Sequence, residues 1–153
     1  MPGPGSAHAN TGLLMFVAHR AMEARVLDAL ATAGFGDVTM AQARVFQRIG
    51  AEGTRLTDLA EQARVTKQTA GFLVDQLERA GYVERRHDPS DARARLVCLA
   101  PRGAEAVEAA AGVVAQVEAE WTAHLGVRDM QHLRQSLLRL REITDPYAAT
   151  QAE

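Results

Sequence analysis

The chain has 153 residues, of which 47% are hydrophobic and 24% carry a charge, and its formal net charge at pH 7 is only -2. This length is typical of one domain, and the apolar content suffices for a core and a subunit interface. No apolar run approaches the length of a membrane span, and the first residues lack a signal-peptide pattern, so we expect a cytoplasmic protein with no membrane partner. Any attraction to nucleic acid must come from local charge.

The first part of the chain predicts a tail followed by two helices. Residues 1–10 are rich in Gly and Pro, and we expect them to be disordered. From Thr11 to about Ala33, apolar residues recur along one side of a long amphipathic helix, which Gly34 and Gly36 end. A shorter helix near Met40 to Ile49 is expected to pack between this helix and the elements that follow.

Two short helices joined by a tight turn come next. We expect Thr57 to cap the first, which runs to Ala63. Arg64 and Val65 form the turn, and Thr66 offers a hydroxyl cap to the second helix. The second helix carries one apolar stripe at the spacing i, i+3, i+4 and i+7, made of Ala70, Leu73, Val74 and Leu77. This order predicts a helix-turn-helix.

The start of the second helix carries side chains that suit DNA. Lys67 and Gln68 fall on its solvated face, where they can reach base edges or phosphates when this end of the helix enters a major groove. Thr69 can add a phosphate contact, and Gly71 is expected on or beside the same solvated face of the helix. The alternative is an ordinary solvated helix start. We expect Phe72, beside the apolar stripe, to pack in the core rather than touch a thymine methyl group.

A β-hairpin is expected after Gly81, which stops the second helix. Two β-rich runs, Tyr82 to Arg86 and Arg95 to Leu99, flank a connection over residues 87–94. Within it, Asp88-Pro89 suits the start of a turn because aspartate caps the turn and proline fixes φ.

Arginines cluster on this hairpin. They are Arg85, Arg86, Arg93 and Arg95. A narrow minor groove attracts arginine through its negative potential, so we expect Arg93 to enter the groove. Asp91, two residues earlier, is expected to hold the Arg93 guanidinium by a charge-assisted hydrogen bond. The alternative is that these charges only protect an edge hairpin from strand addition.

These motifs form one pattern along a third of the chain. It consists of Leu59-Ala60, Val65 to Gln68, Leu73 to Glu78, Gly81 to Arg85, Asp88 to Val97 and Pro101-Arg102-Gly103. In this pattern the chain resembles the multiple-antibiotic-resistance regulator (MarR) family of bacterial transcription factors. Two departures stand out, since relatives often have a second wing arginine in place of Ala92 and a polar or basic pair in place of Gly71-Phe72. Both departures would reduce phosphate contacts.

The resemblance implies a mainly α-helical fold with a small β-hairpin wing. In such a fold a winged helix-turn-helix, here about residues 38–100, lies between dimerisation helices, here about 11–33 and 101–145. We therefore expect residues 11–145 to form a single domain and residues 146–153 to form a C-terminal tail.

The C-terminal part of the chain predicts two more helices. After Pro101 an apolar helix continues to about His124, and Gly126 breaks it. The last helix carries a narrow apolar seam of Met130, Leu133, Leu137 and Leu140. This surface exceeds what one winged helix covers, and the resemblance implies a homodimer. Two copies would place their recognition helices about 34 Å apart, on the two halves of a palindromic operator.

The resemblance also implies a cleft that binds a small aromatic or phenolic effector between the dimerisation helices and the DNA-binding lobe. The candidate lining residues are Met15, Phe16, His19, Arg20, Met22, Phe46 and Trp121. Arg20 could pair with a ligand carboxylate, and His19 could donate to a phenol. The alternative is that the apolar residues belong to the core and the polar ones to the surface.

Other classes of function find little support in the sequence. A Gly-rich phosphate loop, a nucleophile elbow and a metalloprotease motif are all missing, so we expect neither an enzyme nor a cofactor. No two histidines lie three or four residues apart, so we expect no metal, and Cys98 is expected to be an inert thiol. The pattern predicts a sequence-specific regulator that binds double-stranded DNA, in the form of a ligand-responsive repressor. The alternative is a winged-helix module for protein interactions, which would not need the arginine-rich wing.

Overall fold

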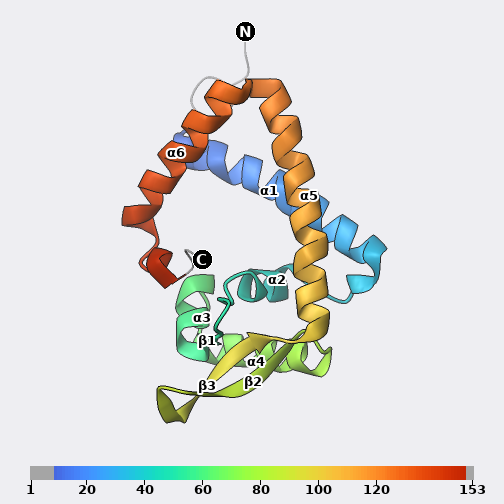
Figure 1. Cartoon of the computed structure of the whole chain (residues 1–153), viewed down its shortest axis with the longest axis vertical. Helices are drawn as coiled ribbons and strands as arrows, with labels where there is room; N and C mark the ends of the chain where they lie inside the picture. The colour runs from blue at the N-terminus through green and yellow to red at the C-terminus, as the bar shows by residue number, and fades with distance from the viewer. Residues whose placement is uncertain (1–8, 151–153) are drawn as a thin grey trace.

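The computed structural model describes residues 9–150 and is mainly helical with a three-stranded wing (Figure 1). Its elements in chain order are α1 (Thr11–Leu30), a wide helical turn η1 (Ala31–Phe35), α2 (Met40–Phe46), β1 (Thr54–Arg55), α3 (Leu56–Ala63), α4 (Lys67–Arg79), β2 (Val83–Asp88), β3 (Asp91–Leu99), α5 (Pro101–Leu125), α6 (Val127–Thr144) and η2 (Ala148–Thr150). The predicted fold class is confirmed. Most of the tail expected at residues 1–10 lies outside the described residues.

One hydrophobic core holds α2, α3 and α4 together. Val45 of α2, Leu59 of α3 and Val74 of α4 are fully buried in it. The stripe predicted on α4 is confirmed, because all four of its residues are buried. Thr39 caps α2, which ends at Phe46, three residues before the predicted end. These contacts make α2, α3 and α4 the body of one lobe.

The turn between α3 and α4 follows the prediction. Arg64 adopts a left-handed conformation with φ of 57°, which ends α3. The Thr66 hydroxyl accepts a hydrogen bond from the Thr69 backbone N–H at 3.1 Å and so caps α4. Local side-chain chemistry therefore sets the angle at which α4 leaves the turn.

A short strand that the sequence pattern did not predict leads into α3. Thr54 and Arg55 form β1, which pairs antiparallel with β3. Because this strand runs straight into the helix, α3 begins at Leu56 with Arg55 at the cap position, and the predicted cap at Thr57 is wrong. β3 therefore lies in the middle of the sheet, between β1 and β2.

The wing hairpin is longer, and its turn tighter, than predicted. β2 runs to Asp88 and β3 begins at Asp91, so only Pro89 and Ser90 connect the strands. The expected connection over 87–94 is wrong because most of its residues extend the ladder. The expected role of Asp88 is confirmed, since its Oδ1 accepts hydrogen bonds from the Ser90 N–H and hydroxyl at 2.8 and 2.7 Å.

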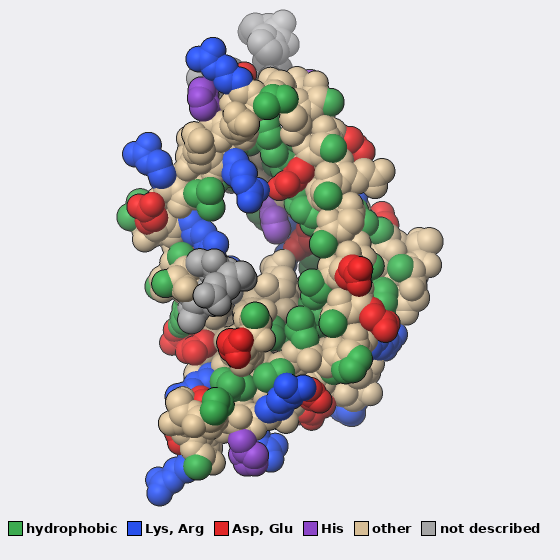
Figure 2. Space-filling model, in the orientation of Figure 1, with side chains coloured by type: hydrophobic (Ala, Val, Ile, Leu, Met, Phe, Trp, Pro, Cys, Tyr) green, Lys and Arg blue, Asp and Glu red, His purple; other side chains and the backbone are tan. Residues whose placement is uncertain are grey.

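The remaining helices form an open frame above this lobe (Figure 1). α1 packs across α5 and continues into η1, where Gly34 has φ of 97° and breaks the helical path as predicted. α6 turns back from α5 at Gly126, where φ is 88°, and no residue of α6 is buried. The space-filling view shows an opening enclosed by this frame (Figure 2). No helix within residues 9–150 is long and apolar enough to cross a membrane.

The C-terminal end of the described chain returns to the lobe. A guanidinium nitrogen of Arg48 lies 3.1 Å from the Asp145 carboxylate, just after α6. The Tyr147 hydroxyl donates to the Glu61 carboxylate on α3. At least the first part of the predicted tail at residues 146–153 is therefore docked on the lobe.

Candidate nucleic-acid interface and effector cavity

The start of α4 presents the polar residues expected to meet DNA. Lys67 and Gln68 are exposed, as are Thr66 and Thr69, whose hydroxyls are 2.9 Å apart and hydrogen-bonded. Gly71 is instead half-buried, and a Cβ built on it would lie 3.7 Å from a Leu56 methyl. The structure thus brings four of the five predicted α4 residues to the surface and turns the glycine toward α3.

Phe72 does not pack in the core, so that prediction is wrong. Its side chain is 58% exposed. It lies four residues after Gln68, and the helical repeat places both on the outer face of α4, opposite the stripe that includes Leu73. An exposed aromatic ring therefore continues the polar surface along the same face.

Arg85 is half-buried, and two carboxylates of α4 engage its guanidinium. Its guanidinium donates to Asp75 at 2.7 Å and to Glu78 at 3.0 Å, both on α4, and the side chain is only 20% exposed. Its backbone N–H also donates to Glu78, at 3.2 Å. Arg86 is exposed and pairs with Glu84. Arg85 therefore braces the wing against α4, and its predicted contact with DNA stays a prediction.

The positively charged side chains of Arg93 and Arg95 extend from β3. Both are exposed, and within the described part of the chain neither guanidinium forms a hydrogen bond or an ion pair. The expected contact from Asp91 to the Arg93 guanidinium is wrong. The Asp91 carboxylate accepts the Arg93 backbone N–H at 3.0 Å and lies 3.9 Å from the Arg55 guanidinium. It shapes the start of β3 and leaves the Arg93 side chain free to bind an anion.

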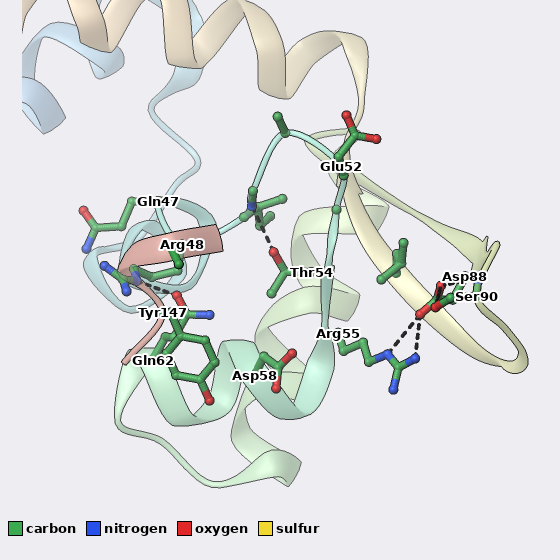
Figure 3. Close-up of a pocket in the computed structure, with 16 residues that line it drawn as sticks. Gln47, Arg48, Glu52, Thr54, Arg55, Asp58, Gln62, Asp88, Ser90 and Tyr147 are labelled. Carbon is green, nitrogen blue, oxygen red and sulfur yellow. Dashed lines mark hydrogen bonds and ion pairs between the residues drawn. The ribbon is translucent and has the colours of Figure 1, made fainter. Parts of the chain in front are cut away.

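The turn of the wing is anchored to the lobe through Arg55, which lies beside a polar hollow (Figure 3). Arg55 donates from Nε and Nη2 to the Asp88 carboxylate at 3.0 and 2.8 Å. Hydrogen bonds from Ser90, together with Arg55, lower the pKa of Asp88 to about 2. The carboxylate stays ionised at neutral pH, so both interactions persist. Arg55 was missed because only the register of β1 brings it to the wing.

The sole cysteine, Cys98, lies in β3, and the backbone at Gly53 passes close to its sulfur. A Cβ built on Gly53 would lie 2.6 Å from the Cys98 Sγ, and Gly53 has φ of 88°. Burial raises the pKa of the Cys98 thiol above its ordinary value. The thiol is therefore protonated at neutral pH, which is consistent with the inert role that we expected.

An apolar cavity of about 600 Å³ lies between α1, α2 and α5. Three of the predicted effector residues line it, namely His19, Met22 and Phe46. The other four, which are Met15, Phe16, Arg20 and Trp121, are not among its lining residues. Arg20 lies instead over the Phe16 ring, with its guanidinium carbon 5.7 Å from the ring centroid. Sequence reasoning missed the wall from α5, where Ala106, Ala110 and Val114 face the cavity.

Tyr82 connects this cavity to the recognition helix. Tyr82 lines the cavity and lies three residues after the end of α4. Its hydroxyl donates a hydrogen bond to Asp37, which lies in the connection between α1 and α2. Arg102, at the start of α5, lies 4.3 Å above the Tyr82 ring and donates to Asp37 at 3.0 Å and to the Ala80 carbonyl at 2.7 Å. Burial and the Asp37 hydrogen bond raise the pKa of Tyr82 to about 12. One cluster thus joins the connection between α1 and α2, the segment after α4, and the start of α5.

The three-helix lobe, the exposed start of α4 and the arginine-bearing wing together define a winged-helix DNA-binding protein. Residues 36–94 match the MarR family. The chain is 33% identical over 104 residues to "Transcriptional regulator HosA" of Escherichia coli O111:H-, a match that covers 67% of this chain and 76% of that protein. The chain belongs to the MarR family of transcriptional regulators, and it is a regulator that binds DNA.

Solved structures agree with this assignment. Wild-type MarR from E. coli in its apo form is 25% identical, with a TM-score of 0.67 and coverage of 87% of this chain and 98% of MarR. The Mycobacterium tuberculosis MarR family protein Rv2887, in complex with salicylic acid, is also 25% identical, with a TM-score of 0.63 and coverage of 88% of this chain and 98% of that protein. The likeness spans the outer helices as well as the lobe.

Proposed function

We propose that this chain is a homodimeric repressor that binds a palindromic operator and releases it when a small molecule enters the cavity between α1 and α5. The observation that carries the proposal is the surface at one end of the lobe, where α4 and the wing lie side by side (Figure 1). There Lys67, Gln68, Arg93 and Arg95 are exposed on adjacent elements.

In the proposed complex, α4 and the wing read different grooves. Lys67 and Gln68 contact base edges or phosphates in the major groove, and Phe72, on the same face, packs against a thymine methyl group. Arg93 enters the adjacent minor groove, where negative potential favours a guanidinium. Thr66 and Thr69 hold phosphate oxygens at the end of the helix.

The outer helices support the proposed dimer. Their large apolar side chains are exposed in the single chain, including Leu13, Leu14, Phe16 and Val17 on α1 and Leu133, Leu137, Leu138, Leu140 and Ile143 on α6. An apolar surface of this extent on two elements is typical of a subunit interface.

The cluster around Tyr82 supports the proposed response to an effector. A ligand in the cavity contacts the Tyr82 side chain, and Tyr82 follows α4 directly along the chain. A shift of α5 relative to α2 would therefore move the lobe that carries α4. If the two recognition helices of a dimer change their separation, they no longer fit both half-sites, and DNA affinity falls. Salicylic acid bound to Rv2887 supports a small-molecule effector here.

Fluorescence anisotropy with the DNA upstream of the chain's own gene tests the proposal, at two salt concentrations and with unrelated competitor DNA. We expect salt-dependent binding of two protomers per site. Arg93→Ala should weaken binding by about 1–3 kcal/mol, and Gln68→Ala should change the preferred sequence. Arg79→Ala, at an exposed position in the last turn of α4 and far from Lys67 and Gln68, is the matched control and should bind like the wild type. Competitor-level binding would favour the protein-interaction module, and a one-chain mass by light scattering would refute the dimer.

A further inference from the structure

We propose that the effector of this regulator is an apolar molecule with a positively charged amine, and that Glu23 binds the amine. This inference rests on the proposed function because it concerns the same cavity between α1, α2 and α5. It differs from the expectation that a ligand carboxylate pairs with Arg20. The charges at the cavity wall and the surroundings of Glu23 carry it.

The cavity wall is apolar apart from a few groups, and the ionised groups among them are acidic. Glu23 of α1 and Glu118 of α5 line the cavity, whereas no lysine or arginine does. The other polar side chains at the wall are those of His19, Gln47 and Tyr82, and the Tyr82 hydroxyl already donates to Asp37. An anionic ligand in this cavity would face two carboxylates without a matching cation in the wall.

Glu23 is the buried member of this acidic pair. Its side chain is only 10% exposed, and its Oε1 is buried and accepts no hydrogen bond within residues 9–150. The nearest cations to Oε1 are Arg20 Nε at 3.6 Å and Arg44 Nη2 at 4.0 Å, and His19 Nε2 lies 3.6 Å from Oε2. These distances give Coulomb attraction but exceed those of hydrogen bonds. Glu118 differs, since it is less buried and lies 3.7 Å from Arg134.

A buried carboxylate oxygen that accepts no hydrogen bond is unfavourable, because the longer contacts with Arg20 and Arg44 do not replace the hydrogen bonds that it makes in water. A ligand ammonium supplies both the donor and the opposite charge, while its hydrocarbon part covers the apolar wall of α1 and α5. A ligand carboxylate would instead add repulsion at this point. The side chains of Arg20 and Arg44 are partly exposed, and neither residue lines the cavity.

Three naphthalene probes of nearly equal size test the charge preference on the unmodified protein. Naphthylmethylamine is cationic at neutral pH, naphthylmethanol is neutral and naphthoate is anionic. We expect calorimetry to show the amine binding at least about tenfold more tightly than the alcohol, with naphthoate weakest. Naphthoate binding as tightly as the amine would overturn the inference, whereas the effector-responsive regulator itself would stand.

The variant Glu23→Gln tests the role of Glu23. Glu108→Gln, at an exposed position of α5, is its matched control. We expect Glu23→Gln to lower affinity for the amine about tenfold and leave that for the alcohol unchanged, while Glu108→Gln changes neither. Unchanged amine affinity in Glu23→Gln would overturn the role of Glu23. If none of the three probes binds the wild type, the cavity does not bind such ligands, and the inference is overturned. Operator binding, measured separately by anisotropy, decides the DNA part of the proposed function in each case.

Discussion

Two glycines on α5 should respond in opposite directions to the same substitution. Gly103 is buried at the start of the helix, where a built Cβ would lie 2.1 Å from the Tyr82 carbonyl oxygen and 3.2 Å from the Phe46 ring. Gly112 lies on the same helix, and a Cβ there meets nothing within 4 Å. Gly103→Ala and Gly112→Ala therefore share their effect on helix propensity and differ in packing.

The magnitudes follow from these contacts. Alanine stabilises a helix interior by up to about 1 kcal/mol relative to glycine, so Gly112→Ala should raise the free energy of unfolding by this amount. At Gly103 the contact with the Tyr82 oxygen must lengthen by about 1.3 Å, from 2.1 Å to an ordinary 3.4 Å. Overpacking of this kind costs about 1–3 kcal/mol. The displaced carbonyl also accepts the Ala100 N–H at 3.0 Å, and loss of that bond costs about 1 kcal/mol more.

We expect Gly103→Ala to lower the free energy of unfolding by about 2 kcal/mol, the balance of these terms. Urea unfolding followed by circular dichroism measures it, with all three proteins at one concentration because dissociation of a dimer contributes to the transition. Equal stability of Gly103→Ala and Gly112→Ala would refute the reasoning. So would a stabilised Gly103→Ala, since it would mean that α5 moves away from Tyr82 without cost.

Three further predictions concern the DNA face and the titrating groups. Phe72→Ala should leave the melting temperature unchanged, because the ring is exposed, but weaken operator binding by about 1 kcal/mol in anisotropy; a lower melting temperature with unchanged binding would contradict this. Asp88→Asn should destabilise the protein at neutral pH, and the difference in thermal melts should close as pH falls from 3.8 to about 2, since the lowered pKa of Asp88 makes its contribution present above that range. Tyr82 and Tyr147 are the two tyrosines of the chain, and burial of Tyr82 and the Glu61 hydrogen bond of Tyr147 raise both pKa values to about 12. Phenolate absorbance should therefore stay low at pH 10 in the folded protein, and the stabilisation from both hydroxyls is lost only as pH rises through about 12. If half of the total phenolate absorbance had already developed at pH 10, the result would contradict this prediction.

Features of the fold that depend on a few neighbouring residues could be predicted. The Thr66 cap, the buried stripe on α4 and the breaks at Gly34 and Gly126 each follow from local chemistry and helical repeat. The tight turn was only half predicted. Asp88 was identified as its cap, but the pairing of β2 with β3 continues to Asp88 and Asp91, which leaves only two residues in the turn.

Contacts between distant segments could not be predicted in the same way. Arg55 reaches Asp88, and Arg85 reaches α4, through strand register and the packing of the wing, which leave no local signal. The position of Phe72 could have been derived by counting from Gln68, since residues four apart share a face. The sequence gives no local signal that singles out Glu23. Its burial arises from the crossing of α1 and α5, which brings the apolar wall around it.

Arg85 has a consequence for how the DNA-binding end can move. It ties β2 to two carboxylates on α4, so we expect the wing and the recognition helix to move together. Motion that starts in the cavity should then rotate or translate the two elements with little change in the angle between helix and ribbon. In the proposed mechanism, the bases preferred within one half-site are then the same with and without effector. The tolerated distance between two half-sites is the variable, and operators differing only in spacer length should differ most in their sensitivity to effector.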